Sequence, residues 1–109
     1  MKTRTEKDTL GHKAVPFDAY YGIQTQRAVE NFPISGIRIS EPFIRAYMCV
    51  KKAAALSNIE DGMLDKKKGK SIVKAINEVL EGKYRDQFVV DIFQMGAGTS
   101  FNMNCNEVI

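Results

Sequence analysis

Apolar residues recur at helical spacing through the middle of the chain. Between Ser40 and Gly62, the main apolar positions are separated by four, three and four residues, which is typical of one helical face. These positions are Phe43, Tyr47, Val50 and Ala54, and the face is broadened by Ile44, Met48 and Ile59. Because Ser40 is a good N-cap and Pro42 suits a first turn, the pattern predicts an amphipathic helix over 40–62.

A second helix is predicted over 65–82. Asp65 is its N-cap candidate and Gly82 stands where the helix should end. Its apolar stripe consists of Ile72, Val73, Ile76, Val79 and Leu80. Two consecutive amphipathic helices should bury their stripes against each other, so we expect residues 40–82 to form an αα-hairpin.

The first 39 residues lack helical periodicity until about Thr25, and we expect an extended arm followed by a short helix. The residue before Pro16 is restricted to an extended backbone, and Pro33 should stop the short helix. Three aromatic residues in this arm are expected to pack on another surface, part of which lies outside the chain: Phe17, Tyr20 and Tyr21.

Residues 83–109 contain an apolar run, a glycine turn and a helix start. The run 88–93 predicts a strand, and Gly96 and Gly98 then precede Thr99 and Ser100. The first turn of a helix binds anions through its unpaired N–H groups and the positive end of its dipole. Thr99 or Ser100 could instead serve only as a helix cap, and on this local pattern alone we favour that simpler interpretation.

Two further features mark this last segment. Asn102 and Asn106 lie four residues apart and should project from one helical face, which would give half of a polar site. Val108 and Ile109 resemble the first apolar positions of a helix without a stop signal, so we expect the helix to continue beyond the chain.

Composition fits one soluble domain or a piece of a larger one. The 109 residues are 44% hydrophobic and 27% charged with a net charge of +3, and no apolar stretch approaches the roughly 20 residues that a bilayer crossing needs. Without a signal-peptide core, a cytoplasmic location is expected. The lysines at 66–68 and 70 are interpreted as a solvated helix start, and we expect no nucleic-acid or membrane partner.

The catalytic residue types are sparse. His12 lies in the polar arm, where we expect it at the surface, and no acid pair, HExxH spacing or phosphate-binding loop with a following lysine occurs. Cys49 and Cys105 lack the spacing of a metal pair, and we expect free, partly buried thiols. From the residues alone, the sequence predicts a helical domain with an anion-binding turn and no metal site.

The order of several motifs resembles the N-terminus of the fumarase and aspartase superfamily over essentially the whole chain. The motifs are Arg-Thr-Glu-Lys-Asp at 4–8, Val-Pro at 15–16, Ala-Tyr-Tyr-Gly-Ile-Gln-Thr-Gln-Arg-Ala at 19–28, Glu-Asn-Phe at 30–32, Val-Lys-Lys-Ala-Ala-Ala at 50–55, Asp-Gln-Phe at 86–88, Gly-Ala-Gly-Thr-Ser at 96–100, Asn-Met-Asn at 102–104 and Asn-Glu-Val-Ile at 106–109. The motifs at 19–22 and 96–100 are more similar to aspartate ammonia-lyases than to class II fumarases.

The resemblance implies a mainly α fold. Residues 1–109 would be an incomplete N-terminal lyase domain, composed of an arm and short helix (1–39), a helical hairpin (40–82) and a strand-like segment with the glycine loop and next helix start (83–109). The long helical bundle of the family is missing. In the family that bundle is the core of a homotetramer, whose active sites each combine three subunits.

The implied activity is reversible elimination of ammonia from L-aspartate to give fumarate, without metal or organic cofactor. Thr99, Ser100 and Asn104 match the segment that binds substrate, whereas the family's catalytic serine lies on a loop outside this chain. Arg27 and Lys51 are expected to make structural salt bridges rather than order the site. The chain should therefore be inactive alone. The alternatives are a class II fumarase domain and a non-catalytic helical interaction module.

Overall fold

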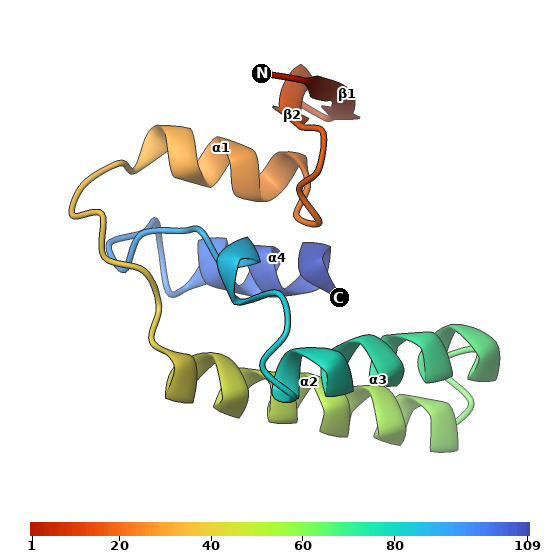
Figure 1. The fold of residues 1–109 in the computed structure, drawn as a ribbon. Helices are drawn as coiled ribbons and strands as arrows, with labels where there is room; N and C mark the ends of the chain where they lie inside the picture. The colour runs from red at the N-terminus through yellow and green to blue at the C-terminus, as the bar shows by residue number, and fades with distance from the viewer. The chain divides into compact units, whose positions relative to one another are not determined.

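The computed structural model describes all residues, 1–109, and the fold is mainly helical (Figure 1). The chain divides into two compact units. One unit combines residues 1–39 with residues 86–108, and the other comprises residues 40–85. The glycine turn and the helix that follows it belong to the first unit.

The N-terminal arm is extended, as expected, but it folds back on itself as a β-hairpin. Strands β1 (Thr3–Asp8) and β2 (Gly11–Pro16) pair antiparallel, with Asp8 opposite Gly11 at the turn. The Asp8 carboxylate accepts a hydrogen bond from Leu10 N at 2.9 Å, and Gly11 has a φ of 116°, a backbone conformation that favours glycine.

Arg4 holds the inner face of this hairpin against the loop that follows it. Its guanidinium donates to four backbone carbonyls, those of Pro16, Phe17, Ala19 and Tyr21, at 2.7–3.0 Å. Its Nε also pairs with Glu6 at 2.7 Å. These charge-assisted bonds give the loop 16–21 a defined course before the first helix. Tyr20 is nevertheless more than half exposed, and Phe17 is nearly half exposed.

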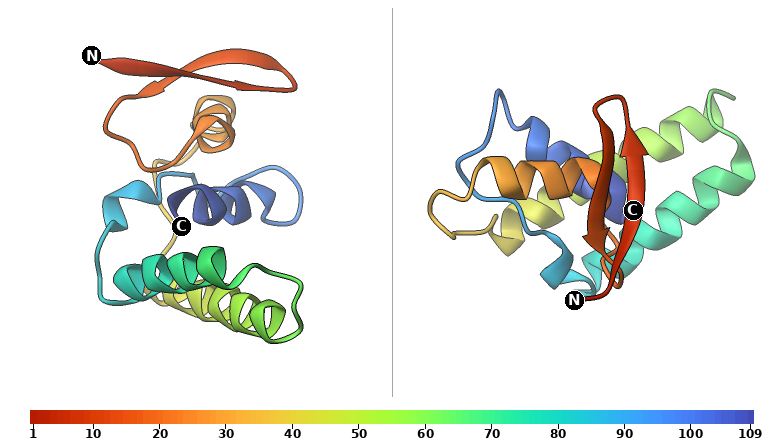
Figure 2. Two further views of the ribbon diagram at one scale, coloured as in Figure 1. Left: turned by 90° about the vertical axis from the view of Figure 1, so that its right-hand side faces the viewer. Right: turned by 90° about the horizontal axis from the view of Figure 1, so that it is seen from above.

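Helices α1 (Ile23–Asn31) and α4 (Thr99–Val108) pack beside each other within the same unit. The left view of Figure 2 shows the hairpin, α1 and α4 as successive layers. Their core contains Val15, Ile23, Phe88, Val90, Phe101 and Cys105. The predicted short helix and the predicted helix start near Thr99 are both confirmed, although α1 begins two residues earlier than expected.

The second unit is the predicted αα-hairpin. Helix α2 (Glu41–Glu60) packs on α3 (Lys66–Leu80), and the Asp65 side chain caps α3 by accepting from Lys68 N at 3.0 Å. Gly69 lies so close to Ile59 of α2 that a Cβ at this position would overlap its side chain. None of the helices is long and apolar enough to span a bilayer.

The apolar face predicted for α2 is partly wrong. Ile44, Met48 and Ala55 are its buried residues, whereas Phe43 and Val50 are more than half exposed. Helix α2 therefore has two apolar faces, and the spacing by four and three residues selected the exposed one.

The strand predicted at 88–93 is also wrong. A short 3₁₀ helix, η1 (Arg85–Gln87), precedes an irregular segment whose only pairing is an isolated bridge between Asp91 and Arg38. Phe88 and Val90 are buried in the core beside α4, so their apolar character reflects packing against a helix rather than pairing in a sheet.

Candidate functional site

The glycine turn leads directly into the first turn of α4. Gly96 and Gly98 have φ values of 69° and 88°, which a residue with a side chain rarely adopts. They aim the chain so that Thr99 begins the helix with its side chain exposed, while Ser100 is half-buried. The first helical hydrogen bond is donated by Asn102 N to Gly98 O at 3.0 Å. The arrangement leaves the N–H groups and hydroxyls of Thr99 and Ser100 together at the positive end of α4.

Gln94, which the sequence analysis did not select, caps this helix. Its Oε1 accepts a hydrogen bond from Phe101 N at 2.8 Å, and its Nε2 donates to Asp91 O at 3.2 Å. A glutamine five residues before a helix start is outside the usual capping positions, so helix rules alone gave no signal for it. Its side chain spans the glycine turn and fixes both ends.

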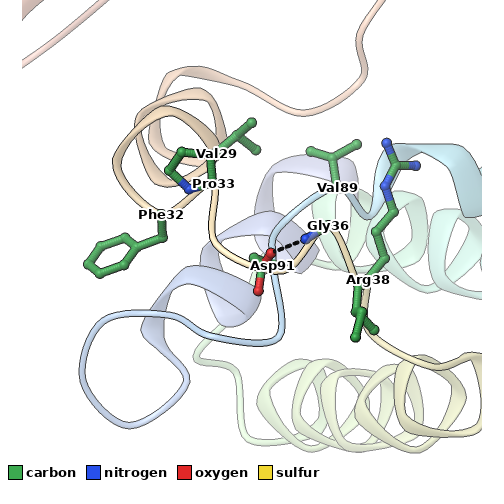
Figure 3. A pocket seen from close by; sticks show the side chains of 8 residues that line it. Val29, Phe32, Pro33, Gly36, Arg38, Val89 and Asp91 are labelled. Carbon is green, nitrogen blue, oxygen red and sulfur yellow. Dashed lines mark hydrogen bonds between the residues drawn. The ribbon is translucent and has the colours of Figure 1, made fainter.

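Asp91 anchors the segment from which Gln94 extends. Its carboxylate accepts hydrogen bonds from the backbone of Ser35, Gly36 and Phe93 and from the Ser35 hydroxyl, all at 2.8–2.9 Å. Figure 3 shows its bond to Gly36. The hydrogen bond from the Phe93 amide foremost, then those from the Ser35 hydroxyl and from the Ser35 and Gly36 amides, lower the pKa of Asp91 from 3.8 to about 2. The carboxylate is therefore fully committed to holding two loops together.

Asn104 occupies the middle of α4 and is completely buried. Its Oδ1 accepts from Val89 N at 3.0 Å, and its Nδ2 donates to Gln87 O at 2.9 Å. The amide thus satisfies the backbone of the irregular segment where a strand neighbour would otherwise do so. Among the three predicted substrate ligands, Thr99 and Ser100 are adjacent in the first turn, whereas Asn104 faces the interior.

The last turn of α4 is fixed to the first turn of α1 by Glu107. Its carboxylate accepts hydrogen bonds from Gln24 N at 3.1 Å, from Thr25 N at 2.7 Å and from Thr25 Oγ1 at 2.6 Å. Glu6 accepts from Ile23 N at 3.0 Å beside it. Two carboxylates thereby neutralise the positive end of α1, while no acidic residue stands in the first turn of α4.

The other residues considered from sequence lie away from this turn. His12 is exposed on β2, as expected. Arg27 pairs with Asp8 at 2.8 Å, and its hydrogen bond lowers the pKa of that carboxyl, which fits the expected structural salt bridge. Lys51 lies over the Tyr47 ring. Both cysteines are free, and Cys105 is buried whereas Cys49 is exposed rather than partly buried.

A pocket of about 310 Å³ lies where the Asp91 carboxylate holds the two loops together (Figure 3). Its lining is mostly apolar and comes from the end of α1, the loop after it and the segment near Val89. The residues are Val29, Phe32, Pro33, Gly36, Ile37, Arg38, Val89 and Asp91. Neither the glycine turn nor α4 contributes to it, so this pocket is separate from the first turn of α4.

Comparison with known proteins agrees with this architecture. A family model described as "Lyase" matches residues 11–109. An aspartate ammonia-lyase from Bacillus sp. is 62% identical over 97% of this chain and 23% of its own length, and a class II fumarate hydratase from Halobacterium salinarum is 58% identical over the same shares. A crystal structure of a fumarate lyase:delta crystallin from Brucella melitensis superposes with a TM-score of 0.94 at 50% identity, over 98% of this chain and 25% of that one.

The chain spans about a quarter of the length of the relatives it matches. The matched residues include strand β2, helix α1, the αα-hairpin of α2 and α3, and the glycine turn with α4, in the order that the sequence motifs indicated. The chain belongs to this lyase family and represents the N-terminal part of the fumarase/aspartase superfamily fold.

Proposed function

We propose that the complete enzyme eliminates ammonia from L-aspartate to give fumarate, and that this chain supplies donors for a substrate carboxylate. The observation that carries the proposal is the first turn of α4. There the adjacent residues Thr99 and Ser100 bring their N–H groups and hydroxyls to the helix start, where the helix dipole favours an anion. Asn104 serves the same site indirectly, by fixing α4 against the segment 87–89.

The chemistry places charge where such donors are most effective. A base removes a proton from the carbon beside the distal carboxylate, and the electron pair left behind spreads onto that carboxylate. The pair then forms the carbon–carbon double bond while the carbon–nitrogen bond breaks and ammonia leaves. Fixed donors stabilise the carboxylate more strongly as its charge grows, so they lower the barrier and not only the dissociation constant. The base comes from outside this chain.

We propose aspartate as the substrate in place of malate on the basis of two motifs. The turn Ala-Tyr-Tyr-Gly at 19–22 and the loop 96–100 both resemble those of aspartate ammonia-lyases. A class II fumarase is the second candidate, because the sequence identity of this chain to the Halobacterium fumarate hydratase is close to its identity to the Bacillus aspartate ammonia-lyase. The two reactions share proton removal and carboxylate stabilisation and differ only in the leaving group.

The test is an assay of the complete enzyme with each substrate separately. Fumarate formation from L-aspartate, with no formation from L-malate, is the expected result. Fumarate from malate alone would make the enzyme a fumarase, and activity with neither would refute the proposal. The homotetrameric assembly and the cytoplasmic location that the resemblance and composition suggest belong to the same proposal, and sedimentation of the complete enzyme tests the assembly.

Thr99 distinguishes substrate binding from helix capping. If Thr99 binds substrate, Thr99→Ala in the complete enzyme lowers kcat/KM at least several-fold with nearly unchanged stability. If Thr99 only caps the helix, Thr99→Ala would cost about 1 kcal/mol of stability and leave the kinetic constants unchanged. Thr5→Ala is the matched control, because Thr5 is exposed on β1.

We also expect the 109-residue chain to be inactive alone. It holds donors for one carboxylate, and the catalytic base comes from elsewhere in the complete enzyme. Fumarate formation by the purified chain, free of host enzyme, would contradict this expectation.

A further inference from the structure

The first turn of α4 is capped by a neutral side chain. Helix starts are commonly stabilised by carboxylates, and in this same unit the first N–H groups of α1 donate to two of them, those of Glu6 and Glu107. Helix α4 instead receives the neutral amide of Gln94 on Phe101 N. From Gln94 to Asn106 the sequence contains no acidic residue. The positive end of α4 is therefore capped without being neutralised.

The nearest acid that precedes the turn, Asp91, is prevented from neutralising it. Its carboxylate accepts from Ser35, Gly36 and Phe93, and only its backbone oxygen interacts with Gln94. That backbone oxygen takes the Nε2 donor of Gln94 at 3.2 Å. Because the amide group has one donor end and one acceptor end, this bond turns Oε1 toward α4 and fixes its orientation.

The cap also decides which donors remain. Phe101 N is occupied by Gln94, and Asn102 N by Gly98 O. The N–H groups of Thr99 and Ser100 are the ones left in the first turn, next to the two hydroxyls. A neutral cap on the third position thus leaves the outer two positions, and the full dipole, for an external anion.

We propose that Gln94 is a positioning and specificity-determining residue, whose neutral amide orders the first turn of α4 while keeping it electropositive for a substrate carboxylate. The inference rests on the proposed function, since it takes Thr99 and Ser100 as the carboxylate donors. It goes further by assigning the charge selectivity of that site to a residue that need not touch the substrate.

The test is Gln94→Glu in the complete enzyme, compared with Gln94→Met. Glutamate has nearly the shape of glutamine and can still accept from Phe101 N, but it adds a negative charge beside the site. Both variants lose the Nε2 donor to Asp91 O, so this loss is common to the two and the added charge distinguishes them. We expect KM for the dicarboxylate to rise about tenfold or more in Gln94→Glu. Gln94→Met removes the cap without adding charge, and its KM should rise less, by about threefold.

Ionic strength separates electrostatic selection from a structural role. Raising the salt concentration from about 0.01 M to about 1 M shortens the Debye length from about 30 Å to about 3 Å, so the KM ratio of Gln94→Glu to wild type should shrink. A merely structural role predicts a ratio independent of salt and a larger effect for methionine than for glutamate. Asn58→Asp, an equal charge change at an exposed position of α2, is the control.

Each outcome has one meaning. Equal KM values for wild type and Gln94→Glu, or a salt-independent ratio, overturn the inference. If the glutamate variant does not fold, Gln94→Met decides, and an unchanged KM in that variant overturns it. If Thr99→Ala also leaves KM and kcat/KM unchanged, the proposed carboxylate site itself fails, whereas an effect of Thr99→Ala without one of Gln94→Glu removes only the role of Gln94.

Discussion

Replacing Glu107 with glutamine is expected to loosen the first turn of α1 without changing the volume of the side chain. In the structure, Oε1 accepts from Thr25 N and Thr25 Oγ1, and Oε2 accepts from Gln24 N. A glutamine has only one acceptor oxygen. If that oxygen keeps the two bonds to Thr25, the new NH₂ group faces the N–H of Gln24, and that bond is lost.

The magnitude follows from these contacts. One hydrogen bond to a charged acceptor contributes roughly 1.5–3 kcal/mol, and removing a negative charge from a helix N-terminus costs a further 0.3–1 kcal/mol or so. Because the bond to Gln24 N is exposed and water replaces part of it, we expect a loss in the lower part of this sum, about 2–3 kcal/mol, which corresponds to about a 30- to 150-fold larger population of the open first turn. The glutamine oxygen is expected to keep its bonds to Thr25, because Thr25 is completely buried and has no water to replace a lost partner.

Amide hydrogen exchange in the complete enzyme measures this loss directly. Peptides that contain Gln24 and Thr25 should exchange faster in Glu107→Gln by about the same factor, because local opening limits exchange of first-turn amides. Glu60→Gln, on an exposed position of α2, should leave these peptides unchanged. Less than about threefold acceleration in Glu107→Gln would refute the view that this carboxylate holds the first turn of α1.

Three further measurements test other parts of the fold. Gly69→Ala should lower the stability of the helical hairpin by up to about 2 kcal/mol despite the better helix propensity of alanine, because the new Cβ overlaps Ile59; a stabilised variant in thermal denaturation would contradict this packing. Because the pKa of Asp91 is lowered to about 2, its contribution to stability is complete above pH 3.8 and is lost as the pH falls through about 2. The difference in thermal midpoint between wild type and Asp91→Asn should therefore stay constant above pH 3.8 and narrow as the pH falls from 3.8 to about 2. In the native 109-residue chain, a maleimide should label Cys49 quickly and Cys105 only after unfolding; equal rates would contradict their different burial.

Local chemistry predicted the elements that are defined by apolar periodicity and caps. The helical hairpin, its Asp65 cap and the helix start at Thr99 were all accessible from sequence for this reason. The β-hairpin was not, because the inward-facing residues of β1 are Arg4, Glu6 and Asp8, which read as polar arm residues. A strand that buries charges against carbonyls and a helix terminus has no alternation of apolar and polar residues to detect.

Helix α2 shows a second limit of periodicity. Spacing identifies an apolar face but not which of two faces is covered within a given chain. Ile44 and Met48 are buried, whereas Phe43, the residue before Ile44, and Val50, two residues after Met48, are exposed. Since neighbouring residues differ by about 100° around a helix, both sets satisfy the same rule, and only the tertiary packing of the helix distinguishes them.

Asn104 could have been placed correctly from the neighbours it has in α4. Phe101 and Cys105 are buried, and Asn104, three residues after Phe101 and next to Cys105, shares their face. Asn102 and Asn106 lie two residues to either side and therefore on the opposite side of the helix, where both are more exposed. The motif of alternating asparagines thus combines one internal amide, which binds Gln87 and Val89, with two outer ones. Together with Gln94 at the start and Glu107 at the end, that internal amide fixes α4 at three points along its length, so these hydrogen bonds oppose rotation of the helix about its axis and hold its first turn in place.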